Sequence, residues 1–445
     1  MLRCPRCAGT LQATSASFAC EACRVTYPLI DGVPWLFPEP EQALSEWRGR
    51  TSALLAHLQR QAAQYRAALT DAVARTSTRN RLKLLASACD DHARRLRALL
   101  APLQAGESAA SAATYAALAP AIAPGQGLGA YYANIHRDWC WGDDENGESL
   151  AAVLRALGAA PQGRVLVLGS GAGRLAYDLH ETGGPATTIA ADINPLLAFV
   201  ARRMFEGERL ELHEFPVAPR DLANHAVLRR LAAPKRARPG LHAVCADAFQ
   251  PPLAQGSFDT VVTPWLVDIV DADLAEVAAT INGLLAPGGR WVCTGTLFFQ
   301  QRDPVQQYST EEVAEVVTAA GFSSPSFEQR RVPYLASPAS RHARNEEVVT
   351  FAVTRMHDAL ARRPALPAWL LDVQRPVPLP QAVAERTLSL RVEGYVASLV
   401  DGRRSVQEIA ARLVEERLLL PHEALGVVRD YVLRLFDEAQ QRARK

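Results

Sequence analysis

The clearest pattern of apolar and polar positions lies near the middle of the chain. Four apolar residues in a row, 165–168, predict a fully buried strand. Gly169, Gly171 and Gly173 follow in alternation, and apolar positions with the spacing of a helix begin near Arg174. Glycine lets the chain turn sharply and lets a ligand lie against bare backbone, and the first N–H groups of a helix face outward without partners. The pattern therefore predicts the first strand–loop–helix unit of a nucleotide-binding α/β sheet.

Apolar runs after this unit predict the further strands of the same sheet. They cover residues 187–191, 241–245, 258–262 and 289–293, and the last run follows an Ala-Pro-Gly-Gly turn at 286–289. Asp192 follows the first run at about the 20-residue interval at which a carboxylate can hold both ribose hydroxyls. Asp247 and Ala248 follow the second run, where a carboxylate and a backbone amide would contact an adenine. This order predicts an α/β fold with a Rossmann-like core.

The spacing of the glycines indicates which nucleotide is bound. The dinucleotide fingerprint G-x-G-x-x-G would need a glycine at position 174, where the chain has Arg174. The spacing here is G-x-G-x-G, the form typical of S-adenosylmethionine (SAM)-dependent methyltransferases. We therefore predict SAM as the cofactor, and Arg174 disfavours an NAD-binding reductase.

Four cysteines near the start of the chain form a second pattern. Cys4 and Cys7 make one C-x-x-C pair, and Cys20 and Cys23 make another. Two such pairs at this spacing place four thiolates around one tetrahedral Zn²⁺, and four protein ligands leave no open position for catalysis. So short a segment buries too little apolar surface to fold without the metal. We therefore predict a structural zinc, with two disulfides or a redox pair as the alternative.

The residues after the cysteines carry a resemblance. The segment at 27–38 reads Tyr-Pro-Leu-Ile-Asp-Gly-Val-Pro-Trp-Leu-Phe-Pro. It resembles the small zinc-ribbon proteins that activate tRNA and protein methyltransferases, and also the zinc-bearing N-terminus of an rRNA guanine methyltransferase. The resemblance implies a ribbon fused to a methyltransferase, and it keeps RNA open as an alternative partner.

The rest of the chain divides by composition and periodicity. We expect a zinc ribbon at 1–40, a helical segment at 41–125, the SAM-dependent methyltransferase domain at 126–358 and a winged-helix-like domain at 359–445. In the helical segment, leucines recur at helical spacing over 54–69 and 82–100. We interpret Arg94, Arg95 and Arg97 as part of a solvated helix face in preference to a nucleic-acid site.

Charge and hydropathy exclude several classes of function. The chain has 48 basic and 47 acidic residues and a net charge of +1, so no overall field points to nucleic acid or to acidic substrates. No apolar run reaches the roughly 18 residues of a transmembrane helix. Cys4 and Cys7 stand where a signal peptide would have its apolar core. We therefore expect a cytoplasmic protein with no membrane partner.

Several segments resemble the carnosine N-methyltransferase family over roughly residues 60–355. That family also lacks the carboxylate that most SAM enzymes carry two residues before the first glycine, and this chain has Val167 there. The matching segments include Arg137-Asp-Trp139 and Asn146-Gly-Glu148, together with residues 165–176, 261–269, 285–299 and 308–322. The resemblance implies Asn134 and Arg137 at the methionine end of SAM, Gly169 in the loop, Asp192 at the ribose, Asp247 at the adenine and Asp268 between cofactor and acceptor.

The same resemblance bears on the methyl acceptor. Asp268 is our candidate catalytic residue, as a base or as a group that orients the acceptor, and its alternative role is to cap the following helix. Where the family has a histidine that grips the dipeptide, this chain has Gln300, which cannot act as a base. We therefore expect methylation of a nitrogen on a peptide or small peptide-like molecule without committing to carnosine. The alternatives are an RNA methyltransferase guided by the ribbon and a non-catalytic SAM-binding scaffold.

The C-terminal region has its own motif. Asp401 and Gly402 form a turn, and Ser405 with Glu408 predicts a capping box that opens a helix. Residues 392–413 resemble the winged-helix peptide-binding domain of pyrroloquinoline quinone biosynthesis. A DNA-binding helix-turn-helix is disfavoured because the helix from Val406 carries no basic face, and a dimerisation module is the alternative.

Overall fold

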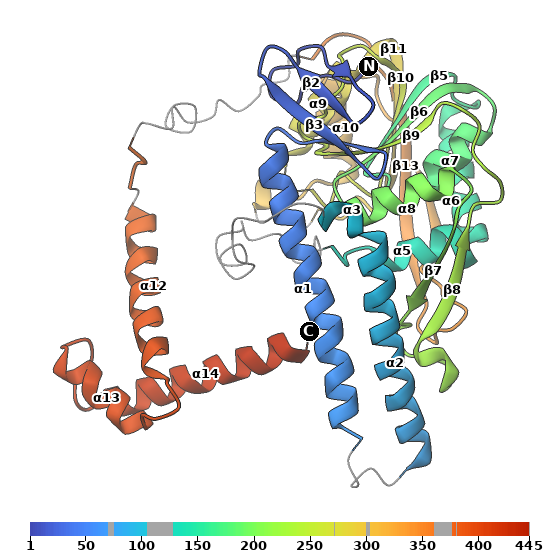
Figure 1. Cartoon of the computed structure of the whole chain (residues 1–445). Helices are drawn as coiled ribbons and strands as arrows, with labels where there is room; N and C mark the ends of the chain where they lie inside the picture. Colours follow the sequence, from blue (N-terminus) through green and yellow to red (C-terminus); the bar gives the residue numbers. More distant parts are fainter. Residues whose placement is uncertain are drawn as a thin grey trace. The chain divides into compact units, whose positions relative to one another are not determined.

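The computed structural model describes residues 1–69, 75–104, 128–270, 272–299, 303–359, 376–379 and 381–444. The chain forms two compact units, Met1–Arg362 and Arg363–Lys445 (Figure 1). No helix in these described ranges is both long and apolar enough to cross a membrane.

The large unit is built on a mostly parallel sheet, which confirms the predicted Rossmann-like fold. Its core strands run parallel in the order β9-β6-β5-β10-β11, and β13 and β12 add antiparallel strands at one edge. Their bounds are β5 Gly163–Leu168, β6 Pro185–Asp192, β9 Leu241–Ala246, β10 Phe258–Pro264, β11 Leu285–Gly295, β12 Glu328–Tyr334 and β13 Arg344–Thr354. β11 begins earlier than the sequence predicts, because Leu285 pairs with Phe258 before the Pro-Gly-Gly segment and regular pairing resumes at Arg290.

Helices cover both faces of this sheet, as the buried strands require. In β5, Val165 and Val167 face one hydrophobic cluster, while Leu166 and Leu168 face another, because successive side chains of a strand point to opposite sides. The first cluster includes side chains of α6, α7 and α8, and the second includes side chains of α9 and α10. These helices are α6 Asp143–Leu157, α7 Arg174–Glu181, α8 Pro195–Phe205, α9 Leu274–Leu284 and α10 Thr310–Ala319.

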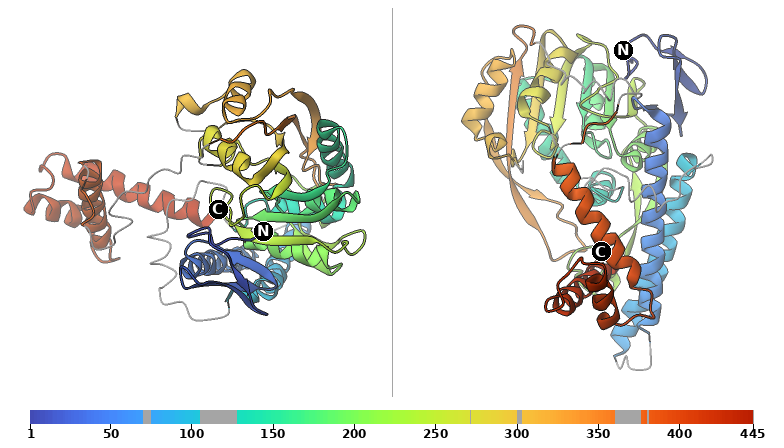
Figure 2. Two further views of the ribbon diagram at one scale, coloured as in Figure 1. Left: turned by 90° about the horizontal axis from the view of Figure 1, so that it is seen from above. Right: turned by 90° about the vertical axis from the view of Figure 1, so that its left-hand side faces the viewer.

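Two long helices and a hairpin flank the first of these faces. Helices α1 (Pro40–Ala67) and α2 (Thr76–Leu99) lie side by side, with the short α3 (Ala101–Gln104) after them (Figures 1 and 2). The hairpin of β7 (Arg209–Glu214) and β8 (Val227–Ala232) contacts α2. The predicted helical segment thus contains α1 and α2, and its residues 70–74 and 105–125 lie outside the described residues.

The N-terminal segment joins the same sheet. Its strands are β1 (Gln12–Ala13), β2 (Ser17–Cys20), β3 (Val25–Ile30) and β4 (Val33–Leu36). β4 runs parallel to β9, with Trp35 opposite Cys245 and Leu36 opposite Ala246. The ribbon and the catalytic core therefore share one sheet, a connection that the sequence did not predict.

The small unit consists of helices in its described residues. These are α12 (Gln381–Leu399), α13 (Val406–Glu415) and α14 (Ala424–Arg444), packed around a core that includes Leu399, Ile409 and Val428. Ser405 and Glu408 form the predicted capping box. Residues 376–379 and 381–444 contain no strand, so the wing of a winged helix has no counterpart there, and the domain assignment stays a prediction.

Candidate active site

The glycine loop after β5 adopts a conformation that favours glycine. Gly169, Gly171 and Gly173 have φ angles of +68°, +58° and +89°. A Cβ at Gly169 would stand 2.9 Å from Leu266 Cδ1, and one at Gly173 would stand 2.7 Å from Phe205 Cζ. A Cβ at Gly171 would meet nothing within 4 Å. Close packing therefore requires two of the glycines, while Gly171 borders open space.

Asp192 stands at the carboxyl end of β6, next to this loop. Its Oδ2 accepts a hydrogen bond from the Gly171 N–H at 2.8 Å, and its Oδ1 accepts one from the Asn194 N–H at 2.9 Å. Burial raises the pKa of Asp192 to about 6. The carboxylate thus ties the glycine loop to the start of α8, and each of its oxygens can accept a further hydrogen bond from a ligand.

A cavity of about 470 Å³ opens in front of the loop. It lies at the carboxyl ends of the parallel strands, where open α/β sheets bind their ligands. Seven of the predicted cofactor-binding residues line it: Asn134, Arg137, Gly169, Gly171, Asp192, Asp247 and Ala248. Gly173 does not line it, because this residue packs against α8.

One wall of the cavity comes from an irregular helical segment. Helix α5 (Tyr132–His136) passes directly into a π-helical turn, Arg137–Trp141, a feature that often occurs at functional sites. Trp139 Nε1 donates to the Ala172 carbonyl at 2.8 Å, and Arg174 Nη1 donates to the Asp138 carbonyl at 2.7 Å. These bonds hold the segment against the glycine loop. Arg174, which replaces the third glycine of a dinucleotide fingerprint, thereby has a structural role.

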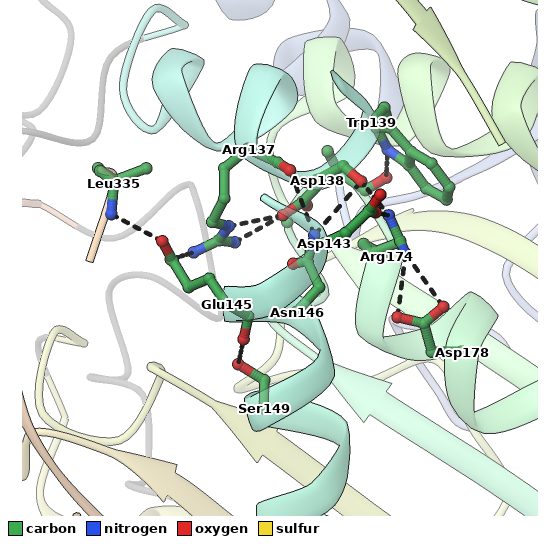
Figure 3. A network of polar contacts seen from close by, with 12 residues as sticks. Arg137, Asp138, Trp139, Asp143, Glu145, Asn146, Ser149, Arg174, Asp178 and Leu335 are labelled. Carbon is green, nitrogen blue, oxygen red and sulfur yellow. Dashed lines mark hydrogen bonds and ion pairs between the residues drawn. The ribbon is translucent and has the colours of Figure 1, made fainter. Parts of the chain in front are cut away.

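Arg137 is fixed within this wall by two carboxylates (Figure 3). Its guanidinium pairs with Asp138 at 2.7 Å and with Glu145 at 3.1 Å, and Glu145 also accepts the Leu335 N–H at 2.9 Å. Burial opposes the charge of the guanidinium, yet the two carboxylates raise the pKa of Arg137 above its ordinary value. Arg137 therefore stays charged and is rigidly held, and Asp138 lines the cavity beside it.

Asn134 lies one helical turn before Arg137 and offers an unused acceptor. Its Oδ1 is buried and has no hydrogen-bond partner among the described residues. A buried polar atom without a partner is costly, so such an atom in a cavity wall indicates a place for a ligand donor. Asn134 Oδ1 can therefore accept a hydrogen bond from a ligand.

Asp247 and its neighbours close the far end of the cavity, beyond β9. Asp247 Oδ1 accepts the Phe249 N–H at 2.9 Å, and burial raises the pKa of this carboxyl. Phe249 also lines the cavity, with 37% of its surface exposed. An apolar ring beside a carboxylate is a surface on which a flat ligand with polar edges can rest.

Asp268 lies behind the cavity wall instead of on it. The wall is formed there by Leu266, Ile269 and Val270. Asp268 is 5% exposed, and its carboxylate accepts hydrogen bonds from Thr296 Oγ1 at 2.8 Å and from the Phe298 N–H at 2.9 Å. Its catalytic role stays a prediction, and Gln300 lies outside the described residues.

The structure adds cavity residues that the sequence analysis missed. Trp265 and Tyr334 form a ring pair with centroids 4.7 Å apart, and Trp265 has a φ of +49°, a strained value for a bulky residue. The position of Trp265 just after a buried strand was an available signal. No sequence signal places Tyr334 beside it. Trp47 and Arg50 reach the same cavity from α1.

The four cysteines of the ribbon converge as predicted. The Sγ atoms of Cys4, Cys7, Cys20 and Cys23 all lie within 4.8 Å of one another. Cys4 and Cys20 are buried in the hydrophobic cluster that also contains Leu36 of β4. Four sulfur ligands at such distances fit one tetrahedral metal ion, and sulfur ligation favours zinc.

The chain matches a known protein family. The family model for carnosine N-methyltransferase matches residues 126–357, just over half of the chain. No curated protein matches the chain in sequence.

Solved methyltransferase structures are similar to about half of the chain. Phosphoethanolamine N-methyltransferase 2 of Haemonchus contortus, solved with SAM, is 17% identical over 47% of this chain and 53% of its own, with a TM-score of 0.31. The YcgJ protein of Bacillus subtilis is 12% identical over 47% of this chain and 99% of its own, with a TM-score of 0.34. A chain from the complex of the Haloferax volcanii Trm112 methyltransferase activator with a putative methyltransferase is 17% identical over 52% of this chain and 98% of its own. Its TM-score is also 0.34.

Proposed function

Because the chain belongs to the carnosine N-methyltransferase family and is a SAM-dependent methyltransferase, we propose that it methylates a nitrogen of a peptide or small peptide-like molecule. The observation that carries this proposal is the cavity in front of the glycine loop. Its lining includes Asp247 and Asp192, which stand at the ends of β9 and β6, and Trp265 and Tyr334, which come from the ends of β10 and β12. One end is suited to a nucleoside, and the other has room for an acceptor.

The proposed position of SAM follows the residues that line this cavity. Asp192 would accept the two ribose hydroxyls, and Asp247 with Ala248 would border the adenine. Arg137 would face the carboxylate of the methionine end, and Asn134 Oδ1 would accept its amino group. Gly171 supports this placement because its missing side chain leaves space in front of the loop.

The remaining chemistry is mainly alignment. Bound SAM supplies a methyl group already activated on a sulfonium, so the protein has to hold the acceptor nitrogen in line with it. Trp265 and Tyr334 line the cavity as a packed ring pair, and an apolar or flat acceptor can rest against it. We propose that Asp268 orients the acceptor indirectly, by fixing the Thr296 hydroxyl and the Phe298 backbone N–H that donate to its carboxylate.

We also propose that the four clustered cysteines hold a structural zinc. The support is the closeness of the four sulfur atoms and the burial of Cys4 and Cys20 in a core shared with the catalytic sheet. With all four positions filled by protein, the metal would take no part in methyl transfer.

Transfer of a labelled methyl group tests the proposed acceptor. The full chain is incubated with SAM carrying a radioactive methyl and, separately, with a peptide and dipeptide fraction and with total RNA. We expect label in the peptide fraction, and mass spectrometry should locate the methyl on nitrogen. Label confined to RNA would support the RNA methyltransferase alternative. SAM binding without label in either fraction would support the scaffold alternative.

The raised pKa of Asp192 predicts a pH dependence of SAM binding. The charged carboxylate would accept hydrogen bonds from the ribose hydroxyls of SAM, and below about pH 6 it becomes protonated. The dissociation constant for SAM should be flat above about pH 7 and should rise by up to about tenfold per pH unit below 6. Since the folded chain takes up this proton more readily than the unfolded chain, protonation of Asp192 does not itself unfold the protein. Calorimetric titrations from pH 5 to 8 measure this profile.

An Asp192→Asn variant provides the control for this prediction. The variant should bind SAM weakly with a profile that no longer bends near pH 6. If the variant and the wild type show the same bend, another group causes the pH dependence.

A further inference from the structure

Helix α1 contributes two side chains to the cofactor cavity from outside the family region. Trp47 and Arg50 line the cavity, whereas the family match covers residues 126–357. Trp47 is 3% exposed, and the Arg50 guanidinium lies over its ring, 4.2 Å from the ring centroid. Neither residue has a role in the site derived so far.

The ribbon determines where α1 begins. β4 runs parallel to β9, so the two strands end at the same edge of the sheet. β9 leads into Asp247 and Phe249, while β4 leads into the start of α1 at Pro40. Trp35 Nε1 donates to the Pro40 carbonyl at 3.1 Å and fixes this junction. Helix α1 therefore leaves the sheet at the end of the cavity that Asp247 closes.

Arg50 is held in place with donor capacity left over. Its guanidinium pairs with Glu46 one turn earlier, and 20% of the Arg50 side chain is exposed. Its Nε is buried and has no hydrogen-bond partner among the described residues. The stacking on Trp47 keeps the planar group fixed, which suits it to contact a flat ligand.

The order of the strands indicates which part of the ligand these side chains meet. The sheet runs β4-β9-β6-β5-β10-β11, so α1 starts beside β9 and β6, the strands that carry Asp247 and Asp192. Trp265 follows β10, and Thr294 lies on β11, toward the opposite end of the cavity. This order puts the start of α1 at the nucleoside end of the cavity, and Trp47 and Arg50 follow that start by about two and three helical turns.

We propose that Trp47 and Arg50 form an adenosine-binding wall of the cofactor site, supplied by the helix that follows the ribbon. Arg50 Nε donates to an acceptor atom of the purine or ribose, and the Trp47–Arg50 stack covers the nucleoside from the side opposite the glycine loop. The proposal rests on the placement of SAM described above. It makes the N-terminal segment part of the cofactor site as well as part of the fold.

Binding of three ligands to Arg50 variants tests this proposal. SAM, S-adenosylhomocysteine and 5′-methylthioadenosine share the nucleoside, and the last lacks the amino-acid end. We expect Arg50→Ala to weaken the binding of all three by about the same factor, roughly tenfold or 1.4 kcal/mol. Arg50→Lys, which keeps the charge but loses the planar fork, should weaken all three by a smaller common factor. Arg60→Ala, on the exposed face of the same helix, should change none of them.

The outcomes separate this proposal from the assignment of the cofactor. If Arg50→Ala left all three dissociation constants unchanged while the KM of the acceptor rose, Arg50 would belong to the acceptor site and the proposal would be wrong. Weakening of SAM and S-adenosylhomocysteine alone would place Arg50 at the amino-acid end and would also overturn it. Failure of the wild type to bind any of the three would instead contradict the proposed function. Trp47→Phe keeps a buried ring but changes its size. If Trp47 and Arg50 form the proposed wall, this variant should weaken the binding of all three ligands by about the same factor.

Discussion

Replacement of Asp192 by alanine is expected to weaken SAM binding by about a hundredfold or more. The variant removes the proposed acceptor of two ribose hydroxyls, and a hydrogen bond to a charged group contributes about 1.5–3 kcal/mol. It also removes the partner of the Gly171 and Asn194 N–H groups, so the loop that borders the cofactor loses its anchor. Isothermal titration calorimetry on the purified full chain measures the change.

Two further variants make this result specific. Asp192→Asn keeps the shape of the side chain and one oxygen acceptor, so it should bind SAM with an intermediate affinity. Asp144→Ala removes an exposed carboxylate at the start of α6 and should leave binding unchanged. Wild-type affinity in a folded Asp192→Ala variant would show that this carboxylate does not hold the cofactor.

Loss of the proposed zinc is expected to have the largest effect on stability. Cys4 and Cys20 are buried in the cluster that contains Leu168 of β5 and Leu266, so an unfolded ribbon would expose one face of the catalytic core. The chain also pairs Arg3 N–H with the Pro252 carbonyl at 2.8 Å, and Ala254 N–H with the Met1 carbonyl at 2.8 Å. We expect Cys20→Ser to lower the melting temperature by more than about 10 °C, which corresponds to several kcal/mol.

The metal itself is measured alongside stability. Mass spectrometry of the native wild type should find one zinc per chain, and Cys20→Ser should lose it. SAM binding should weaken together with the metal, because β4 of the ribbon pairs with β9 and leads into the cavity helix α1. Cys140→Ser, which alters an exposed thiol outside the cluster, should keep metal, stability and binding. A stable, metal-free wild type would contradict the zinc assignment.

Local patterns predicted the catalytic sheet well. Val165 to Leu168 are all buried to 2% exposure or less, as a run of four apolar residues before glycines requires. The cysteines converge because two short C-x-x-C turns within one small segment leave little alternative. In each case the information lies within a few neighbouring residues, so spacing alone is sufficient.

The rest of the site depends on contacts between distant parts of the chain. Arg137 pairs with its neighbour Asp138 and also with Glu145, which in turn holds the Leu335 N–H. Tyr334 reaches the cavity from β12, and Arg50 reaches it from α1. The strand order brings these residues together, above all through the pairing of β4 with β9. Local periodicity does not predict this order.

The central claim is that the cavity before the glycine loop binds SAM with Asp192 at its ribose. A crystal structure of the full chain with S-adenosylhomocysteine tests this claim most directly. We predict that both ribose hydroxyls lie within hydrogen-bond distance of the Asp192 carboxylate and that the amino-acid end meets Asn134 and Arg137. A ligand bound elsewhere, or an Asp192 carboxylate turned away from the ribose, would contradict the account.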